Sequence, residues 1–271
     1  MSRVTAIKRM AGLLSGDDPL SAAVKRPILV IQEFTFLALQ AFRAIFSRPL
    51  YVRDILLQMD RIGVGSLFIV LLTGIFTGMV LALQMSVQLE AFGATNYVGR
   101  VVSASVIREL GPVLAALMVA GRVGAGIASE LGSMTVTEQI DALKAEGTDP
   151  IKKLVVPRLL ACMVMIPALT AITDAVAILG GFVIAVFTLR VDGTFYWTSV
   201  FYVLDPKDFI SGLAKPLVFG FLIAMVGCFS GFRVTGGTEG VGNATTRSVV
   251  AASILILATD FFMTKFFMAV L

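Results

Sequence analysis

The sequence predicts an all-α polytopic membrane protein, with an N-terminal interfacial helix, five transmembrane helices and a short cytosolic helix. Of its 271 residues 57% are hydrophobic and only 15% are charged, and the mean hydropathy is +0.92. Soluble domains have about 45–50% apolar and 25% charged residues. The apolar residues also form several stretches that exceed the roughly 20 residues a bilayer-spanning helix needs.

Five stretches are expected to span the membrane, because each is long, apolar and bounded by polar residues. They are Gly63–Gln88, Val101–Ser129, Leu154–Leu189, Phe209–Phe232 and Ser248–Val270. The third is interrupted by Pro157 and Pro167, but no polar turn divides it. We therefore expect one tilted, kinked helix there rather than two spans. Residues 63–271 would form the transmembrane domain.

Residues 1–62 are expected to form a cytosolic N-terminus that includes an interfacial amphipathic helix over Pro27–Phe46. Polar residues recur at helical spacing on one side of this segment: Glu33, Gln40, Arg43 and Ser47. The helix is long enough to cross the bilayer, but its charged stripe favours a position along the interface. Residues 47–62 are predicted to be a polar linker. The first 19 residues lack the long apolar core of a signal peptide.

The residue types exclude several functions. Histidine is absent, which excludes histidine-based catalytic triads and histidine metal sites. Cys162 and Cys228 lie in apolar runs without neighbouring ligands, so no metal or cofactor site is predicted. The glycine-rich segment Arg233–Asn243 lacks the Gly-Lys-Ser/Thr ending of a phosphate-binding loop, so any ATP hydrolysis requires another polypeptide. The basic residues form no patch with interleaved aromatics, so no nucleic-acid binding is expected.

The distribution of basic residues predicts the orientation in the membrane. Fifteen Lys and Arg residues fall in the N-terminal region, the loop after the second span and the loop before the fifth span, which includes Arg233 and Arg247, against four on the other side. Cytoplasmic loops carry the excess of Lys and Arg. The N-terminus is therefore predicted to be cytoplasmic and the C-terminus to lie on the opposite side.

Arg108 and Glu109 are the charged residues in the second span that most strongly indicate a functional site. Charges within a spanning helix are costly unless they face protein or a water-filled cavity. Pro112 cannot donate to the carbonyl of Arg108, which predicts a kink at this point. Adjacent residues point about 100° apart, so the two side chains are not expected to pair with each other. The alternative is a structural role, in an interhelical salt bridge.

A mostly apolar face is predicted at the end of the first span. Leu81, Met85, Gln88, Leu89 and Phe92 follow one another at spacings of four, three, one and three residues. Such a face suits a lipid chain and a neighbouring helix equally well. Earlier in the same span, the Gly74 and Gly78 pair fits close helix packing.

A short polar helix is predicted between the second and third spans, over about residues 135–147. Thr135 and Glu138 fit a capping box, and Gly147 and Pro150 provide stop signals. Lying outside the hydrocarbon, this helix is expected to contact a partner.

The residues alone leave three function classes open. The first is the membrane subunit of a multi-component transporter, coupled through Thr137–Glu146. The second is a self-sufficient proton-coupled carrier of lipid or a small hydrophobic solute, with Glu109, Asp174 and Asp260 as proton sites. Asp174 has no obvious partner, and capping, pairing across the bundle and protonation all fit it. A membrane enzyme acting on lipid is the weakest class, because no nucleophile or metal cluster accompanies Glu109.

Several long motifs resemble one known family. They read RELGPVLAALMVAGRVGAGIASELGSM, TEQIDAL, DPIKKLVVPRLLA, FTGMVLALQ and NATTRSVVAASILILATDF. From roughly Arg61 to the C-terminus, the chain is similar to the Mla-type (MlaE/YrbE-like) permeases, the membrane subunits of bacterial ABC lipid transporters, which have chloroplast and mycobacterial relatives.

The resemblance implies a non-catalytic permease that forms a homodimer in the bacterial inner membrane. It implies two cytosolic ABC ATPase subunits that bind ATP, a STAS-domain protein and a periplasmic hexamer of MCE-domain proteins. The implied cargo is phospholipid moved between the inner and outer membranes, which maintains outer-membrane lipid asymmetry.

The resemblance also implies two sets of site residues. The substrate set is Leu81, Gln88, Leu89, Phe92, Arg108 and Glu109, with acyl chains against the apolar members from both protomers and Arg108 pairing with phosphate. The ATPase-coupling set is Thr137, Glu138, Asp141, Lys144 and Glu146. Approach of the ATPase subunits would push on this second set and narrow the lipid cavity.

Overall fold

The computed structural model describes residues 19–47 and 49–270, and this part of the chain is helical, with short turns and no strand. Six helical segments are long and apolar enough to cross a membrane. They are Pro27–Ile45, Val52–Glu90, Thr95–Val136, Ile151–Phe187, Ile210–Phe232 and Gly237–Val270. The prediction of an all-α polytopic membrane protein is confirmed.

The chain divides into two units, residues 1–40 and 41–271. Helix α2 (Pro19–Ile45) begins before the predicted start at Pro27, which lies inside the helix. Its segment from Pro27 to Ile45 has the length and composition of a span. The interfacial position of this helix stays a prediction, because length and composition fit both placements.

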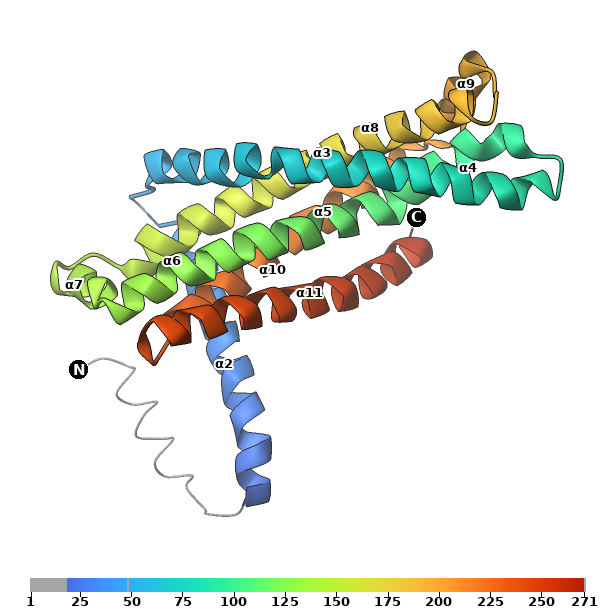
Figure 1. Cartoon of the computed structure of the whole chain (residues 1–271). Helices are drawn as coiled ribbons and strands as arrows, with labels where there is room; N and C mark the ends of the chain where they lie inside the picture. Colours follow the sequence, from blue (N-terminus) through green and yellow to red (C-terminus); the bar gives the residue numbers. More distant parts are fainter. Residues whose placement is uncertain (1–18, 48, 271) are drawn as a thin grey trace. The chain divides into compact units, whose positions relative to one another are not determined.

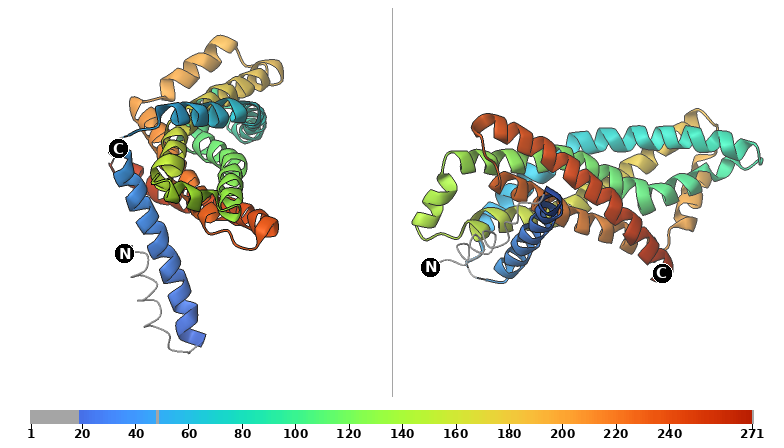
Figure 2. Two further views of the ribbon diagram at one scale, coloured as in Figure 1. Left: turned by 90° about the vertical axis from the view of Figure 1, so that its left-hand side faces the viewer. Right: turned by 90° about the horizontal axis from the view of Figure 1, so that it is seen from below.

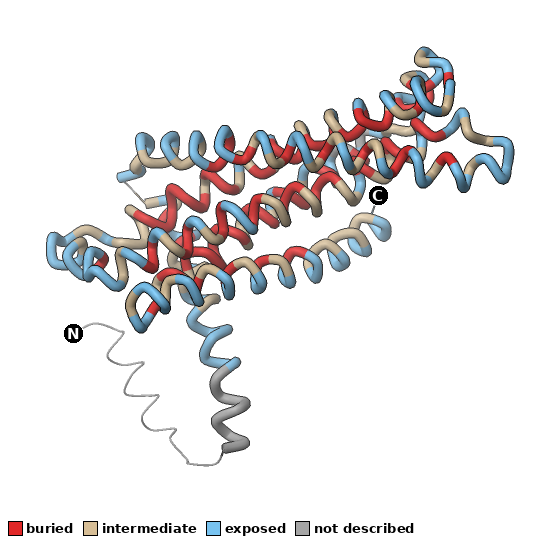
Figure 3. Tube along the Cα trace, in the orientation of Figure 1, coloured by how far each residue is buried: buried red, intermediate tan, exposed pale blue. Residues whose placement is uncertain are grey.

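The second unit is a bundle of long helices that run side by side (Figures 1 and 2). Its elements are α3 (Val52–Glu90), α8 (Val156–Phe187), α10 (Pro206–Phe232), α11 (Gly237–Val270) and a composite helix. The composite contains α4 (Val98–Ser105), η2 (Val106–Leu110), α5 (Gly111–Val119), η3 (Ala120–Gly124) and α6 (Ala125–Val136). Short helices lie at the two ends of the bundle, α7 (Gln139–Ala145) at one and α9 (Gly193–Val203) at the other. Buried residues lie along the facing sides of the long helices (Figure 3).

Glycines set the close packing of α3 against α8. A Cβ atom added to Gly78 would collide with the backbone of Ala177, and one added to Gly180 would collide with the carbonyl of Ile75. A Cβ atom at Gly74 would be tightly packed, 3.0 Å from the carbonyl oxygen of Thr173. Small residues let helix backbones approach in this way within a membrane. The prediction that Gly74 and Gly78 mediate helix packing is therefore confirmed for contacts within this chain.

The predicted start of the first long helix was wrong. Residues 47–62 were expected to be a linker, but α3 begins at Val52. From Val52 to Arg61 the chain has polar residues but neither glycine nor proline, and polarity alone does not end a helix. The third apolar stretch behaves as predicted, since η4 (Ile151–Val155) and α8 form one continuous helical segment with Pro167 inside it.

The predicted capping box at Thr135 and Glu138 does not form. Helix α6 continues to Val136, and the Thr135 hydroxyl donates to the carbonyls of Leu131 and Gly231. Glu138 instead breaks the helix, with a left-handed backbone at φ 58° and no side-chain cap. The short helix is therefore Gln139–Ala145, and the predicted stop signal Gly147 follows its C-cap with a left-handed backbone at φ +78°.

Glu138→Gly is expected to stabilise the turn between α6 and α7. A left-handed backbone conformation costs a non-glycine residue roughly 1–2 kcal/mol of free energy, whereas glycine adopts it without this cost. We expect a gain of up to about 1 kcal/mol, seen as a higher midpoint of thermal unfolding in detergent. Glu146→Gly is the matched control, because Glu146 has φ −75° and should lose stability. If both variants lowered the unfolding midpoint equally, the claim that the backbone of Glu138 is strained would be contradicted.

Candidate functional site

The predicted irregularity before Pro112 takes the form of a π-turn. In η2 the backbone N–H of Gly111 bonds to the carbonyl of Val106, five residues back, and Pro112 has no N–H to donate. The carbonyl of Arg108 is thereby freed, and it accepts a hydrogen bond from Nζ of Lys215 at 2.9 Å. The sequence predicted the free carbonyl but not its partner.

Arg108 and Glu109 do not pair with each other, as predicted, and each forms an ion pair with a different residue of α10. The guanidinium of Arg108 makes a two-point contact with Asp208, with Nε 2.8 Å from Oδ1 and Nη2 3.0 Å from Oδ2. Asp208 also accepts from the backbone N–H of Asp205 in the capping box of α10. The start of α10 thus fixes the carboxylate that orients Arg108.

Lys215 is the central residue of the cluster. Its Nζ donates to the carbonyl of Arg108, to Oε2 of Glu109 at 2.8 Å and to Oγ1 of Thr264 at 2.8 Å. It also lies 3.2 Å from Oδ1 of Asp260 on α11. Only 2% of the Lys215 side chain is exposed. One buried ammonium therefore joins the composite helix, α10 and α11.

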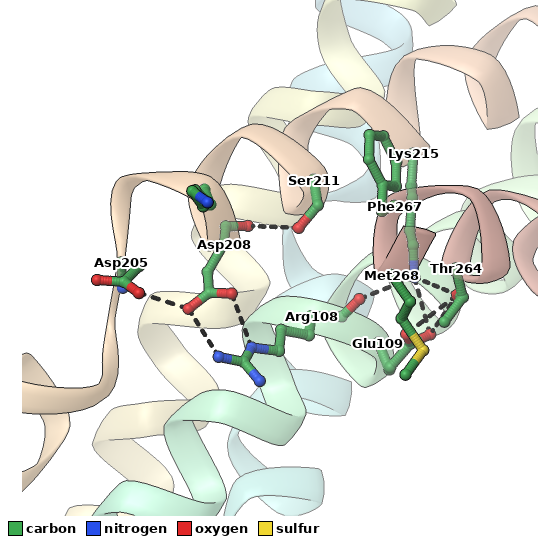
Figure 4. Close-up of a pocket in the computed structure, with 10 residues that line it drawn as sticks. Arg108, Glu109, Asp205, Asp208, Ser211, Lys215, Thr264, Phe267 and Met268 are labelled. Atoms are coloured by element: carbon green, nitrogen blue, oxygen red, sulfur yellow. Dashed lines mark hydrogen bonds and ion pairs between the residues drawn. The ribbon is translucent and has the colours of Figure 1, made fainter. Parts of the chain in front are cut away.

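Except for Asp260, these groups line a pocket of about 280 Å³ (Figure 4). Its lining is strongly polar on one side and apolar at Phe267 and Met268. The lining residues are Arg108, Glu109, Asp205, Lys207, Asp208, Ser211, Lys215, Thr264, Phe267 and Met268. In Figure 4 Arg108 points towards Asp208, and Glu109 points towards Lys215 and Thr264.

Sequence reasoning missed Asp208 and Lys215 as site residues. Lys215 lies inside the apolar stretch Phe209–Phe232, so the cost of an intramembrane charge would have identified it, as it identified Arg108 and Glu109. Asp208 lies at the edge of that stretch, and nothing in its local sequence indicates a pairing with a residue 100 positions away.

A second pocket, of about 320 Å³, lies along α3. It is mostly apolar, with one hydroxyl and one amide in its lining: Phe76, Thr77, Val80, Leu81, Gln84 and Leu110. Leu110 belongs to η2 and directly follows Glu109 in the chain. The π-turn therefore contributes residues to both the charged pocket and the apolar pocket.

The predicted apolar face divides into two parts. Leu81 lines the second pocket, and it also belongs to a buried cluster against which Met85 and Leu89 pack. Gln88 is exposed, and Phe92 is 84% exposed. The expectation that all five residues share one helical face was wrong for Phe92, because α3 ends at Glu90.

The residues of the predicted coupling set lie together at the α7 end of the bundle. Asp141 and Lys144 form an exposed ion pair at 2.8 Å on α7, and the Thr137 hydroxyl donates to the carbonyl of Ser133. Glu138 and Glu146 flank the helix and are exposed. Only Ile140 of α7 is buried. The helix thus presents its polar residues outward.

Comparison with known proteins places this geometry in a family. The model of the family described as Permease MlaE matches residues 55–266. A probable ABC transporter permease protein from Rickettsia felis is 46% identical over 240 residues, which is 89% of this chain and 93% of that protein. The intermembrane phospholipid transport system permease protein MlaE of Haemophilus influenzae is 37% identical, covering 80% and 82% of the two chains. The chloroplastic protein TRIGALACTOSYLDIACYLGLYCEROL 1 of Arabidopsis thaliana is 34% identical, covering 84% of this chain and 65% of that protein.

Proposed function

Because the chain belongs to the MlaE permease family, we propose that it is the membrane subunit of an ABC transporter that moves phospholipid between the inner and outer membranes of a bacterium. The relative from Haemophilus influenzae is named for intermembrane phospholipid transport, which supports this cargo. Such transport would maintain the lipid asymmetry of the outer membrane. This chain would bind and release the lipid, and separate subunits would hydrolyse ATP.

The observation that carries the proposal is a charged pocket within an apolar helical bundle. Glu109 lies 13 residues before Arg122, whose long charged side chain we take to mark the cytoplasmic end of the span. At 1.5 Å per residue this separation is about 20 Å, or two-thirds of a bilayer core of about 30 Å. The pocket would therefore lie at the depth of the outer leaflet, with the apolar pocket on α3 available to an acyl chain.

The remaining parts of the proposal follow from the resemblance to the MlaE-type permeases. The chain would form a homodimer in the inner membrane, with residues 1–62 and α7 in the cytoplasm and the C-terminus in the periplasm. Two ABC ATPase subunits would contact α7 through Thr137, Glu138, Asp141, Lys144 and Glu146. A STAS-domain protein would join them, and an MCE-domain hexamer would cover the periplasmic side. The Lys and Arg distribution supports this orientation.

The alternative of a self-sufficient proton-coupled carrier receives less support. Glu109 and Asp260 both form ion pairs with Lys215, so neither is an isolated carboxyl. Asp174 is 8% exposed, and its Oδ1 has no hydrogen-bond partner in the described part of the chain. A single unpaired carboxyl does not form a proton path, so the coupled transporter is preferred.

Purification of the tagged chain from its own host in mild detergent tests the proposal. We expect mass spectrometry to find phospholipid, an ATPase with a Walker motif and an MCE-domain protein in fixed ratio. Val80→Trp should fill the pocket on α3 and lower the bound phospholipid several-fold. Val87→Trp is the control, since Val87 lies two turns away on the same side of α3 and does not line the pocket. A chain that emerges folded but without lipid and partners would refute the proposal.

A further inference from the structure

We infer that the charged pocket selects phospholipids whose headgroup is zwitterionic and carries a primary ammonium, as in phosphoethanolamine. This inference rests on the proposed function, because it assigns the headgroup that the same pocket would bind. It predicts discrimination against anionic headgroups and, to a smaller degree, against quaternary ammonium headgroups.

The charges around the pocket balance, which disfavours an anionic ligand. Three cations line it, namely Arg108, Lys207 and Lys215, and so do three carboxylates, namely Glu109, Asp205 and Asp208. Asp260 adds a further carboxylate, 3.2 Å from Lys215. An anionic headgroup would therefore meet no excess of positive charge in a medium where an uncompensated charge is expensive.

Lys215 is unable to act as a phosphate ligand in this arrangement. An ammonium has three N–H donors, and Lys215 directs them to the Arg108 carbonyl, the Glu109 carboxylate and the Thr264 hydroxyl. Its side chain is also almost completely buried. All three N–H donors of Lys215 are therefore engaged by protein groups, and none is available to the ligand.

Arg108 retains the capacity to bind a phosphate. The guanidinium has five N–H donors, and the contacts with Asp208 engage only Nε and Nη2. Half of the Arg108 side chain is exposed. Asp208 neutralises its charge but leaves donors on Nη1, so the site offers directed hydrogen bonds to one phosphate rather than a surplus of charge.

Glu109 is the accessible acceptor beside that donor. Its Oε1 accepts from Thr264 at 3.0 Å and its Oε2 accepts from Lys215 at 2.8 Å. A carboxylate has about four lone-pair sites, and 41% of this side chain is exposed, so acceptor capacity remains. Because Glu109 directly follows Arg108, the π-turn presents one phosphate donor and one ammonium acceptor together. A primary ammonium can donate to Glu109, whereas a quaternary ammonium has no N–H to donate.

Lipid competition tests the inference on the complex as purified from the host. The complex would be exchanged into nanodiscs with equal amounts of phosphatidylethanolamine, phosphatidylcholine and phosphatidylglycerol of identical acyl chains, and the bound lipid measured by mass spectrometry. We expect the ethanolamine lipid to be enriched about fivefold or more over the glycerol lipid, with the choline lipid in between. Soluble phosphoethanolamine at the same concentration should displace no lipid, because it lacks acyl chains.

Two variants separate the contributions of Glu109 and Arg108. Glu109→Gln should remove the ethanolamine preference, and Asp208→Asn, which frees Arg108 from its carboxylate, should raise the share of the glycerol lipid several-fold. Glu90→Gln is the control, since Glu90 is exposed and does not line the pocket. The inference would be overturned if the bound lipids had the same proportions as the nanodisc lipids, or if soluble phosphoethanolamine displaced them. Either result would leave the proposed function standing. No bound lipid at all would overturn both.

Discussion

Replacing Lys215 with methionine is expected to destabilise the protein by roughly 3–5 kcal/mol, the cost of removing one partner of a buried ion pair. The substitution leaves the carboxylates of Glu109 and Asp260 without their cation. It also leaves the freed carbonyl of Arg108 without a donor. Unfolding of the detergent-solubilised protein by sodium dodecyl sulfate, followed through the fluorescence of Trp197, would measure the loss.

A second substitution distinguishes charge imbalance from lost packing. In the double variant Lys215→Met and Asp260→Asn, one uncompensated carboxylate is removed, and we expect part of the stability to return. Lys265→Met is the control, because Lys265 is exposed on the same helix as Asp260. If Lys215→Met were no more destabilising than Lys265→Met, the central role of Lys215 in the cluster would be refuted.

The long-range partners in this cluster show where sequence reasoning ends. Arg108 and Glu109 were identified because a charge is costly in an apolar helix, and that argument needs only the local sequence. Their partners Asp208 and Lys215 are 100 and 106 residues away, so the pairing depends on how α10 packs. Lys215 itself was recognisable by the cost of its charge, although its three acceptors were not.

Helix boundaries were less predictable than helix positions. Hydropathy placed the long helices of the bundle because the bilayer requires about 20 apolar residues for each. The end of α6 was misplaced because Thr135 has two acceptors, the carbonyls of Leu131 and Gly231, that compete with capping. The second of these is on α10, which local sequence does not reveal. Similarly, Pro112 predicted a disturbance, but it indicated neither the π-turn nor Lys215 as the donor to the freed Arg108 carbonyl.

Gly78→Ala is expected to lower the free energy of unfolding by roughly 1–3 kcal/mol, and Gly78→Leu by more. The reason is backbone contact: a Cβ atom at Gly78 would lie 2.6 Å from the carbonyl carbon of Ala177. A backbone cannot move aside as the end of a flexible side chain can, so α3 and α8 would have to separate. The same separation would remove the contacts of Gly74 and Gly180 between these helices. Unfolding followed through Trp197 would again measure the change.

Gly242→Ala is the matched control for this prediction. Gly242 lies within α11, and a Cβ atom there would meet no heavy atom of the described chain within 4 Å. Alanine favours the helix over glycine by about 1 kcal/mol, so this variant should be as stable as the native protein or more stable. A loss of stability in Gly242→Ala as large as that in Gly78→Ala would show that glycine flexibility, rather than contact between α3 and α8, accounts for the effect. If only Gly78→Ala loses stability, the backbones of α3 and α8 must be in direct contact along the part of α3 that lines the apolar pocket.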